Sequence, residues 1–278
     1  MDSLLENENE GADSALLPVI ALGAVAIRVA RELSERLGRL VLLEVADDDR
    51  DGKTSEIPEF DFPAGSPIRY VLYDRAEVGA AMVQAVAAKA KTGGKVIAFE
   101  IAAPGAKRAP SWRLGVDVLL RVADEAECLA AAEVLLPMAT PPQGLISVDA
   151  DDVLALFEGA DVVQTGIGTA AGAQAVDAAV AQALGTLPWK PEFLHGILLF
   201  LAGGDSLGMK EVNASMDAIM ARASADCNIV FGAEVEPMLG DRVRITLLAT
   251  CGKRKESHDA SNWMMGMLEG KFEGDENE

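Results

Sequence analysis

The stretch Gly196–Asp205 (GILLFLAGGD) decides the fold class of this chain. Its apolar part, Gly196–Ala202, shows no alternation of polar and apolar residues, which is typical of a strand covered on both faces. The run is far shorter than the ~20 residues that cross a bilayer. Gly203-Gly204-Asp205 then turns the chain toward the next element, a helix predicted over 210–224. A buried strand followed by a helix indicates an α/β layout.

The same pattern extends in both directions from this stretch. On its C-terminal side we expect strands over 228–235 and 242–250, separated by a loop with Pro237 and Gly240, and we expect these strands to be antiparallel neighbours. On its N-terminal side, a short helix over 151–157, a strand over 161–166 and an Ala-rich helix over about 170–184 are predicted. The N-terminal half predicts strands over 18–22, 40–45, 69–73, 95–101 and 116–120, and helices over 26–37, 78–91 and 125–136.

Five segments of the second half, in order, resemble the C-terminal domain of FtsZ, the bacterial relative of tubulin. Residues 145–153 are similar to the family's LINxDFxDV loop, and 166–172 to its GTGxASG segment. The opening stretch 196–205 is similar to GVLxNITGG. Residues 226–233 and 244–250 are similar to the DANIIFGA and RVTVVAT strands. Five ordered matches over about 110 residues are specific for the fold, although each alone is weak.

The resemblance implies an α/β, FtsZ/tubulin-like fold: a Rossmann-like N-terminal domain, a connecting helix and a smaller α+β C-terminal domain. The expected divisions are an acidic disordered arm (1–14), a degenerate nucleotide-binding-type domain (15–124), the connecting helix and loop (125–144), an FtsZ C-terminal-type domain (145–252) and a tail (253–278).

The first half departs from the family at its glycine-rich turns. Where FtsZ has GVGGAGGNAV, this chain has Ala21–Ala30, which retains the single glycine Gly23. Where FtsZ has the phosphate loop GGGTGTGAAPV, this chain has Tyr73–Val83, which retains Gly79 and the two alanines after it. Gly23 and Gly79 are therefore remnants of a nucleotide site and are not expected to bind nucleotide.

A phosphate cradle needs backbone N–H groups close to the anion, and glycine permits that approach. Tyr73 adds bulk to this turn, and Asp74 and Glu77 add negative charge that repels a triphosphate. Arg75 alone is a poor substitute for a nest of amides. We therefore expect no cofactor; GTP belongs only to an alternative in which the chain is a divergent, self-polymerising GTPase.

Asp149 and Asp152 match the two acids of the family's loop that enters the neighbouring subunit's nucleotide site. The resemblance implies that they help to position the attacking water there. The family's Asn is Ser147 here. An equally weighted interpretation is that Ser147 or Asp149 caps the helix that follows. Gly166, Gly168 and Gly172 favour a tight turn and close packing rather than phosphate binding.

The tail suggests a peptide that binds a protein groove. Its apolar residues are Trp263, Met264, Met265, Met267 and Leu268, and they follow the basic cluster 253–255. A helix that folds back on its own domain is slightly favoured over this interpretation. A scaffold that binds its partner through this tail is one alternative function.

Composition restricts the partners. With 24 Lys+Arg against 44 Asp+Glu, the formal net charge is −20, which argues against nucleic acid and against an anionic membrane surface. The N-terminus does not resemble a signal peptide, and three widely spaced cysteines fit a reducing compartment, so a cytoplasmic location is expected. We expect a pseudo-GTPase, leaning away from enzymatic activity, that associates with an FtsZ-type protein or with itself in division or membrane remodelling.

Overall fold

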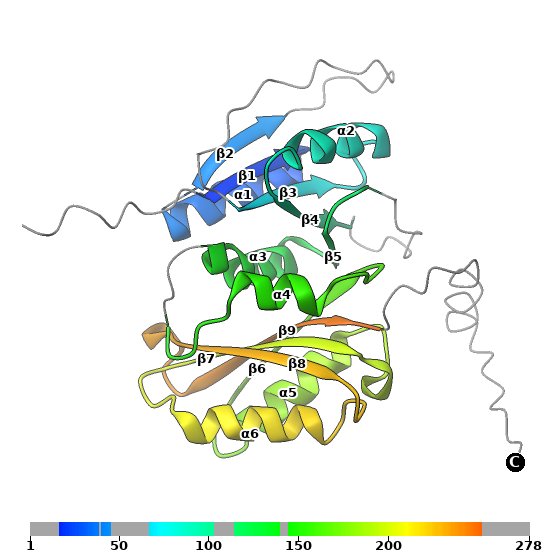
Figure 1. Ribbon diagram of the computed structural model, residues 1–278. Coiled ribbons are helices and arrows are strands. Elements are labelled where there is room, and N and C mark those ends of the chain that lie inside the picture. The colour runs from blue at the N-terminus through cyan, green and yellow to red at the C-terminus, as the bar shows by residue number, and fades with distance from the viewer. Residues whose placement is uncertain (1–16, 39, 46–66, 103–113, 140–143, 252–278) are drawn as a thin grey trace, which may run out of the picture.

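A computed structural model of the chain describes residues 17–38, 40–45, 67–102, 114–139 and 144–251. Their strands form one nine-stranded sheet in the order β2-β1-β3-β4-β5-β6-β9-β7-β8 (Figure 1). The sheet is parallel from β2 to β6, and β9 runs antiparallel to both of its neighbours. The α/β fold class predicted from the sequence is confirmed by this architecture.

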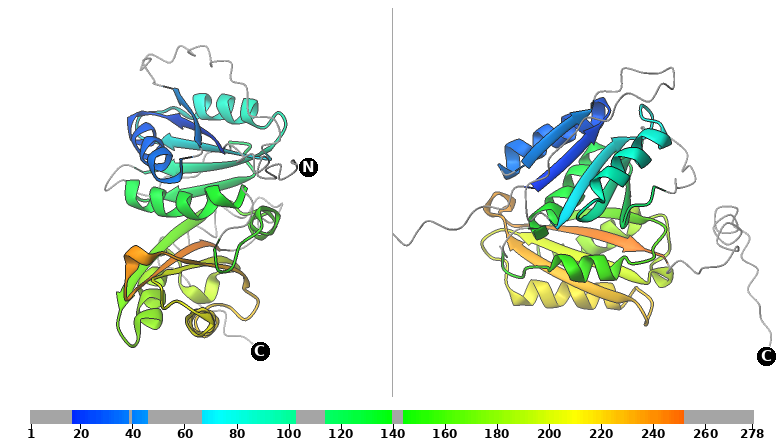
Figure 2. Two further views of the ribbon diagram at one scale, coloured as in Figure 1. Left: turned by 90° about the vertical axis from the view of Figure 1, so that its left-hand side faces the viewer. Right: turned by 45° about the horizontal axis from the view of Figure 1, so that its top comes forward.

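The first half is a parallel sheet with helices on both faces. Its strands are β1 (Leu17–Leu22), β2 (Leu40–Val45), β3 (Ile68–Asp74), β4 (Lys95–Ile101) and β5 (Val118–Val122). One face packs on α1 (Ala24–Leu37) and α3 (Glu125–Leu135), and the other packs on α2 (Ala80–Ala90). Figure 2 shows α1 and α2 on opposite sides of these strands. The lack of alternation in the sequence follows from this double burial, since β1 and β3 are buried at every position.

The second half contains β6 (Val163–Ala171), β7 (Gly196–Gly203), β8 (Asn228–Val235) and β9 (Arg242–Thr250). The expectation that the last two strands are neighbours is wrong. β7 lies between them, parallel to β8 and antiparallel to β9. The turn η3 (Pro237–Leu239) therefore carries the chain past β7 rather than closing a hairpin. The apolar α5 (Ala175–Thr186) and α6 (Met209–Met220) share a core with these strands.

Two predicted features of residues 166–172 need correction. Gly166 and Gly168 lie inside β6, and α5 begins only at Ala175, not near 170. A Cβ at Gly166 would lie 2.3 Å from the carbonyl oxygen of Ala183, and one at Gly168 would lie 1.9 Å from that of Ala179. The glycines therefore let α5 approach the strand, which is the expected close packing. The turn itself comes at Gly172, whose φ is +89°.

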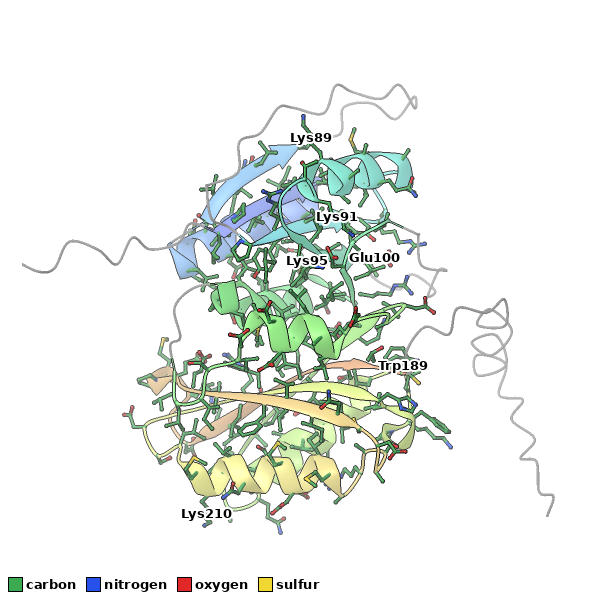
Figure 3. The ribbon with its side chains drawn as sticks, in the orientation of Figure 1. Lys89, Lys91, Lys95, Glu100, Trp189 and Lys210 are labelled. Atoms are coloured by element: carbon green, nitrogen blue, oxygen red, sulfur yellow. The ribbon has the colours of Figure 1, made fainter. Side chains whose placement is uncertain are left out.

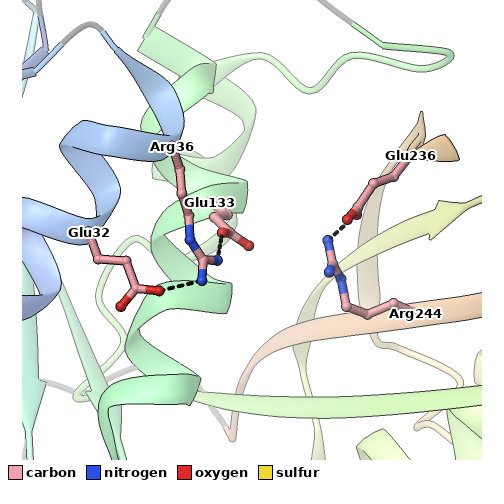
Figure 4. Close-up of polar contacts among 5 residues, drawn as sticks. All are labelled: Glu32, Arg36, Glu133, Glu236 and Arg244. Carbon is pink, nitrogen blue, oxygen red and sulfur yellow. Dashed lines mark hydrogen bonds and ion pairs between the residues drawn. The ribbon is translucent and has the colours of Figure 1, made fainter. Parts of the chain in front are cut away.

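The two halves meet along a short pairing of β5 with β6, in which Leu120 and Arg121 lie opposite Val163 and Gln164. Helix α4 (Ala150–Leu156) packs on β7 and β8 beside this junction, and α3 also contacts β6 and β9. Figure 4 shows Arg36 of α1 between Glu32 and Glu133, with the ion pair of Glu236 and Arg244 (2.6 Å) across from them in the second half. No helix in the described part of the chain is long and apolar enough to cross a membrane.

Candidate functional site

The two remnant glycines come together at the carboxyl edge of the first-half sheet. Gly23 precedes α1 and Gly79 precedes α2, and the strands before them, β1 and β3, are paired with Leu22 opposite Tyr73. Gly23 has a φ of +87°, which favours glycine, and a Cβ there would lie 3.1 Å from the Cβ of Asp74. Gly79 has an ordinary extended backbone and open space where a Cβ would be. Only Gly23 thus has a structural need for glycine.

The N-terminus of α1 carries a carboxylate from the same chain. The backbone N–H of Ala24 donates to Oε2 of Glu77 at 2.7 Å, although the two residues are 53 positions apart. The first N–H groups of a helix have no partner within the helix and form a natural anion site. α1 has no side-chain cap from Gly23 and no acid in its first turn, so Glu77 supplies the negative charge.

A second carboxylate lies beneath this contact. Asp74 is buried, and its Oδ1 accepts a hydrogen bond from the backbone N–H of Ala76 at 2.8 Å. Burial raises the pKa of Asp74, the N–H of Ala76 opposes that shift, and the nearby charge of Glu77 adds to it. The turn after β3 therefore places two acids at the edge where the family would hold phosphate.

Next to these acids, the arginines of the same edge are paired with Glu100 of β4. Glu100 is 1% exposed and accepts three short contacts: from Oη of Tyr73 (2.7 Å), Nη1 of Arg75 (2.7 Å) and Nε of Arg121 (2.6 Å). Tyr73, Glu100 and Arg121 stand opposite one another on three adjacent strands, and Figure 3 labels Glu100. Burial and the charge of Glu100 both raise the pKa of Tyr73, so its hydroxyl remains a donor.

Sequence reasoning missed Glu100 and Arg121. Each is a charged residue within the apolar, buried part of its strand, KVIAFEI or VLLRV, and a charge buried in this way requires a partner. Their mutual pairing could have been inferred from that pattern. Glu77 was recognised from the sequence as a source of repulsion, but its contact with Ala24 was not.

These residues do not fit a bound triphosphate. The amide at the start of α1 is engaged by Glu77, the space beside Gly23 is occupied by Asp74, Glu77 and Val78, and the positive charge of Arg75 and Arg121 faces Glu100. A phosphate group would have to displace Glu77 and would meet the carboxylates of Glu77 and Asp74. Contacts within the chain therefore stabilise the carboxyl edge of the first-half sheet without a ligand.

Asp149 and Asp152 lie in the second half, away from this edge. Both are exposed, and α4, which they begin, packs on β7 and β8. Asp149 is the N-cap of α4, and its Oδ1 accepts from the N–H of Asp151 at 2.7 Å. Asp149 thus makes the contact that the capping interpretation predicts. The carboxylate of Asp152 accepts no hydrogen bond from the described residues. Ser147 is exposed and precedes the cap.

The predicted tail site, comprising Trp263, Met264, Met265, Met267 and Leu268, lies outside the described residues, as do the arm 1–14 and the basic cluster 253–255. Among the described residues, no group of His, Cys, Asp and Glu side chains is arranged to hold a metal ion. The two partly exposed cysteines are poor nucleophiles, since burial raises the pKa of Cys227 and of Cys251 to about 11.

Comparison with known families identifies the second half. Residues 160–252 match the model of the FtsZ family C-terminal domain. This range covers β6 to β9 with α5 and α6, and four of the five segments that resemble FtsZ in sequence fall wholly or mostly in it.

Solved structures extend the likeness to the whole sheet. An empty FtsZ dimer from M. jannaschii has a TM-score of 0.67 at 17% identity, with 85% of this chain and 88% of that chain covered. CetZ2 from Haloferax volcanii, as a GTPγS-bound protofilament, has a TM-score of 0.60 at 15% identity, with 91% and 98% covered. CetZ1 from the same organism, a GDP-bound monomer, has a TM-score of 0.60 at 15% identity, with 92% and 100% covered. The FtsZ/tubulin-like fold predicted from the sequence is confirmed.

Proposed function

Because residues 160–252 match the FtsZ C-terminal domain and the chain has the fold of FtsZ, we propose that it is a cytoskeletal protein that has lost nucleotide binding and acts by association. It is a pseudo-GTPase that binds FtsZ-type filaments or further copies of itself. The solved relatives that form a dimer and a protofilament support self-association.

The contact of Glu77 with the α1 N-terminus carries this proposal. A carboxylate at 2.7 Å from the Ala24 amide supplies from within the chain the charge that a phosphate would supply from outside. Glu100 supports the same conclusion, because it neutralises arginines at the neighbouring strand ends. The edge is complete without GTP, so assembly of this chain does not depend on nucleotide in its own pocket.

The second half retains what an adaptor would need. Asp149 and Asp152 are exposed before and within α4, where a neighbouring subunit could reach them. In the proposed complex, Asp152 faces the GTP of a true FtsZ and helps to orient water there, while Asp149 fixes the start of α4. Because this chain lacks the usual nucleotide pocket, a further subunit cannot add to it in the usual way. It therefore caps or modulates a filament. Roles in division or in membrane remodelling both remain compatible with this activity.

Light scattering and GTP turnover of FtsZ from the same host test the proposal. The chain alone should hydrolyse no GTP, and its addition to FtsZ should change both the scattering amplitude and the turnover rate. Asp152→Asn should weaken the change in turnover more than the change in scattering, because the carboxylate acts on GTP whereas the fold makes the contact. The matched control is Asp226→Asn, an exposed acid two residues before β8.

Two outcomes would contradict the proposal. Turnover by the chain alone would make it a divergent GTPase, and unchanged FtsZ assembly at excess chain would remove the filament partner. In the second case, pull-down with a chain lacking 253–278 would test the scaffold that binds through its tail.

A further inference from the structure

Charge is unevenly distributed along this chain. Residues 122–189 contain ten acids and no Lys or Arg; the acids are Asp124, Glu125, Glu127, Glu133, Asp149, Asp151, Asp152, Glu158, Asp161 and Asp177. Residues 78–99 contain three lysines and no acid, in a protein whose net charge is −20. Such segregation gives the surface regions of opposite sign.

The three lysines lie between the last turn of α2 and the start of β4, and they form what we call the basic turn: Lys89, Lys91 and Lys95, all labelled in Figure 3. The Nζ atoms of Lys91 and Lys95 both lie 3.4 Å from the same oxygen of Asp117. Their side chains remain 46% and 60% exposed. One carboxylate thus serves two ammonium groups, at a distance longer than a good ion pair.

Two arginines of the surface are paired more closely. Arg28 lies 2.5 Å from Glu125, Arg31 lies 2.5 Å from Glu44, and each has that carboxylate to itself. The other oxygen of Asp117 is also engaged, since it accepts from the backbone N–H of Val96 at 2.9 Å. The positive charge of Lys91 and Lys95 is therefore less completely neutralised than that of these two arginines.

The opposite charge gathers on α4. Asp151 and Asp152 of α4 and Glu158, two residues beyond its end, are exposed, and we call them the acidic face. No ion pair joins any of the three to a Lys or Arg in the described part of the structure. α2 packs on β3 and β4, whereas α4 packs on β7 and β8, so the basic turn and the acidic face belong to different parts of the sheet (Figure 1).

We propose that the basic turn of one copy binds the acidic face of α4 in a second copy. This inference rests on the self-association in the proposed function and names its surfaces. Two molecules of charge −20 repel each other where acidic surfaces meet. The exposed side of α2 adds no such repulsion to the contact, because Ala81, Gln84 and Ala88 are uncharged. The contact joins two different surfaces and is therefore heterologous. A row of copies joined in this way has a free basic turn at one end and a free acidic face at the other.

Charge reversal with the full chain tests the pairing. Lys91→Glu with Lys95→Glu and, separately, Asp151→Lys with Glu158→Lys should each weaken self-association about tenfold or more in sedimentation velocity, because like charges then face each other. An equimolar mixture of the two variants should associate better than either alone. In that mixture, every contact between unlike variants joins opposite charges.

The control is Lys190→Glu with Lys210→Glu, which changes the net charge as much as the lysine variant does at exposed positions elsewhere. It should keep most of the self-association, and thermal melts should show that all variants fold. Equal weakening in the control and the lysine variant, or a mixture no better than its components, would overturn the proposed contact. A wild-type chain that stays monomeric yet alters FtsZ assembly would also overturn it while leaving the proposed function in place.

Discussion

Glycine serves different purposes in the two halves of this molecule. In the second half, a Cβ would lie 1.9 Å from a backbone oxygen at Gly168, 2.0 Å from one at Gly204 and 2.6 Å from a Val148 methyl at Gly232. In the first half, Gly79 has no atom within 4 Å of that position, and Gly23 is distinguished by its positive φ. Glycines that pack strands against helices are needed with or without a ligand, whereas glycines that face a ligand are not.

The family model that matches residues 160–252 is that of the C-terminal domain, so the match lies in the half whose glycines are required by packing. The second half keeps its sequence pattern because the packing of its own backbone requires it. The first half has the sheet and helices of the fold, while the turn after β3 carries Asp74 and Glu77. Four predictions test whether the side chains at the carboxyl edge of the first-half sheet stabilise the fold rather than bind a ligand.

The largest expected effect is at a packing glycine. Gly168→Ala should destabilise the fold by about 3 kcal/mol, since the obstacle is the backbone of α5 and the methyl overpacks the interface. Gly79→Ser should be neutral or stabilise by about 0.5 kcal/mol, because serine is a good N-cap and has room. Urea unfolding measures both. Similar losses at the two positions would contradict the comparison.

Nearly as large an effect is expected at the buried cluster. Glu100→Gln should cost about 3 kcal/mol, because it leaves Arg75 and Arg121 largely buried without their counter-charge. The control is Glu44→Gln at an exposed ion pair, where about 0.5 kcal/mol is expected. A Glu100→Gln protein as stable as wild type would mean that Glu100 is not needed to hold this edge together.

A smaller loss is expected at the α1 N-terminus. Glu77→Ala removes the acceptor of the Ala24 amide and should lower the free energy of unfolding by about 1 kcal/mol. Glu158→Ala, at an exposed acid that forms no ion pair within the described part of the structure, should change it by less than about 0.5 kcal/mol. If the two variants matched in denaturant titrations, Glu77 would not be acting as the cap of α1.

The smallest effect depends on pH. Burial raises the pKa of Asp74, so its ionised form at neutral pH costs stability, and this cost disappears as the pH falls through the raised pKa toward the ordinary value near 4. Asp74→Asn keeps an oxygen for the Ala76 amide and removes the charge. The variant should melt slightly above wild type at neutral pH, with a difference that shrinks on acidification. Melting curves that stay parallel across pH would contradict this assignment.

Much of the fold could be predicted from the sequence, because strands buried on both faces are continuous apolar runs and the resemblance supplied their topology. The position of β9 between β6 and β7 could not, since a loop with Pro237 and Gly240 looks the same whether or not it closes a hairpin. The start of α5 was predicted too early because alanine at 170 and 171 suits a helix, while pairing with Val243 and Arg242 holds both residues in β6.

The candidate site was predicted in part. The sequence was enough to predict the capping alternative for Asp149, which its contact with Asp151 supports, while the loss of the phosphate turns stays a prediction. It could not show that the Glu77 side chain reaches the Ala24 amide, because that contact depends on the pairing of β1 with β3 and on the turn after β3. Glu100 and Arg121, charged residues within the apolar parts of β4 and β5, could have been recognised from the sequence. Their pairing follows from the register of the two strands.

The proposed function requires that Glu77 take the place of a phosphate at the α1 N-terminus. Calorimetric titration of GTP into the wild-type chain tests it most directly, with Glu77→Ala and Gly79→Ser measured beside it. We predict no saturable binding to wild type or to Gly79→Ser at GTP concentrations up to about 1 mM, where a complex of that Kd would be detected. Saturable binding to the wild-type chain, weakened by Gly79→Ser, would mean that Glu77 does not replace a phosphate and that the chain binds nucleotide.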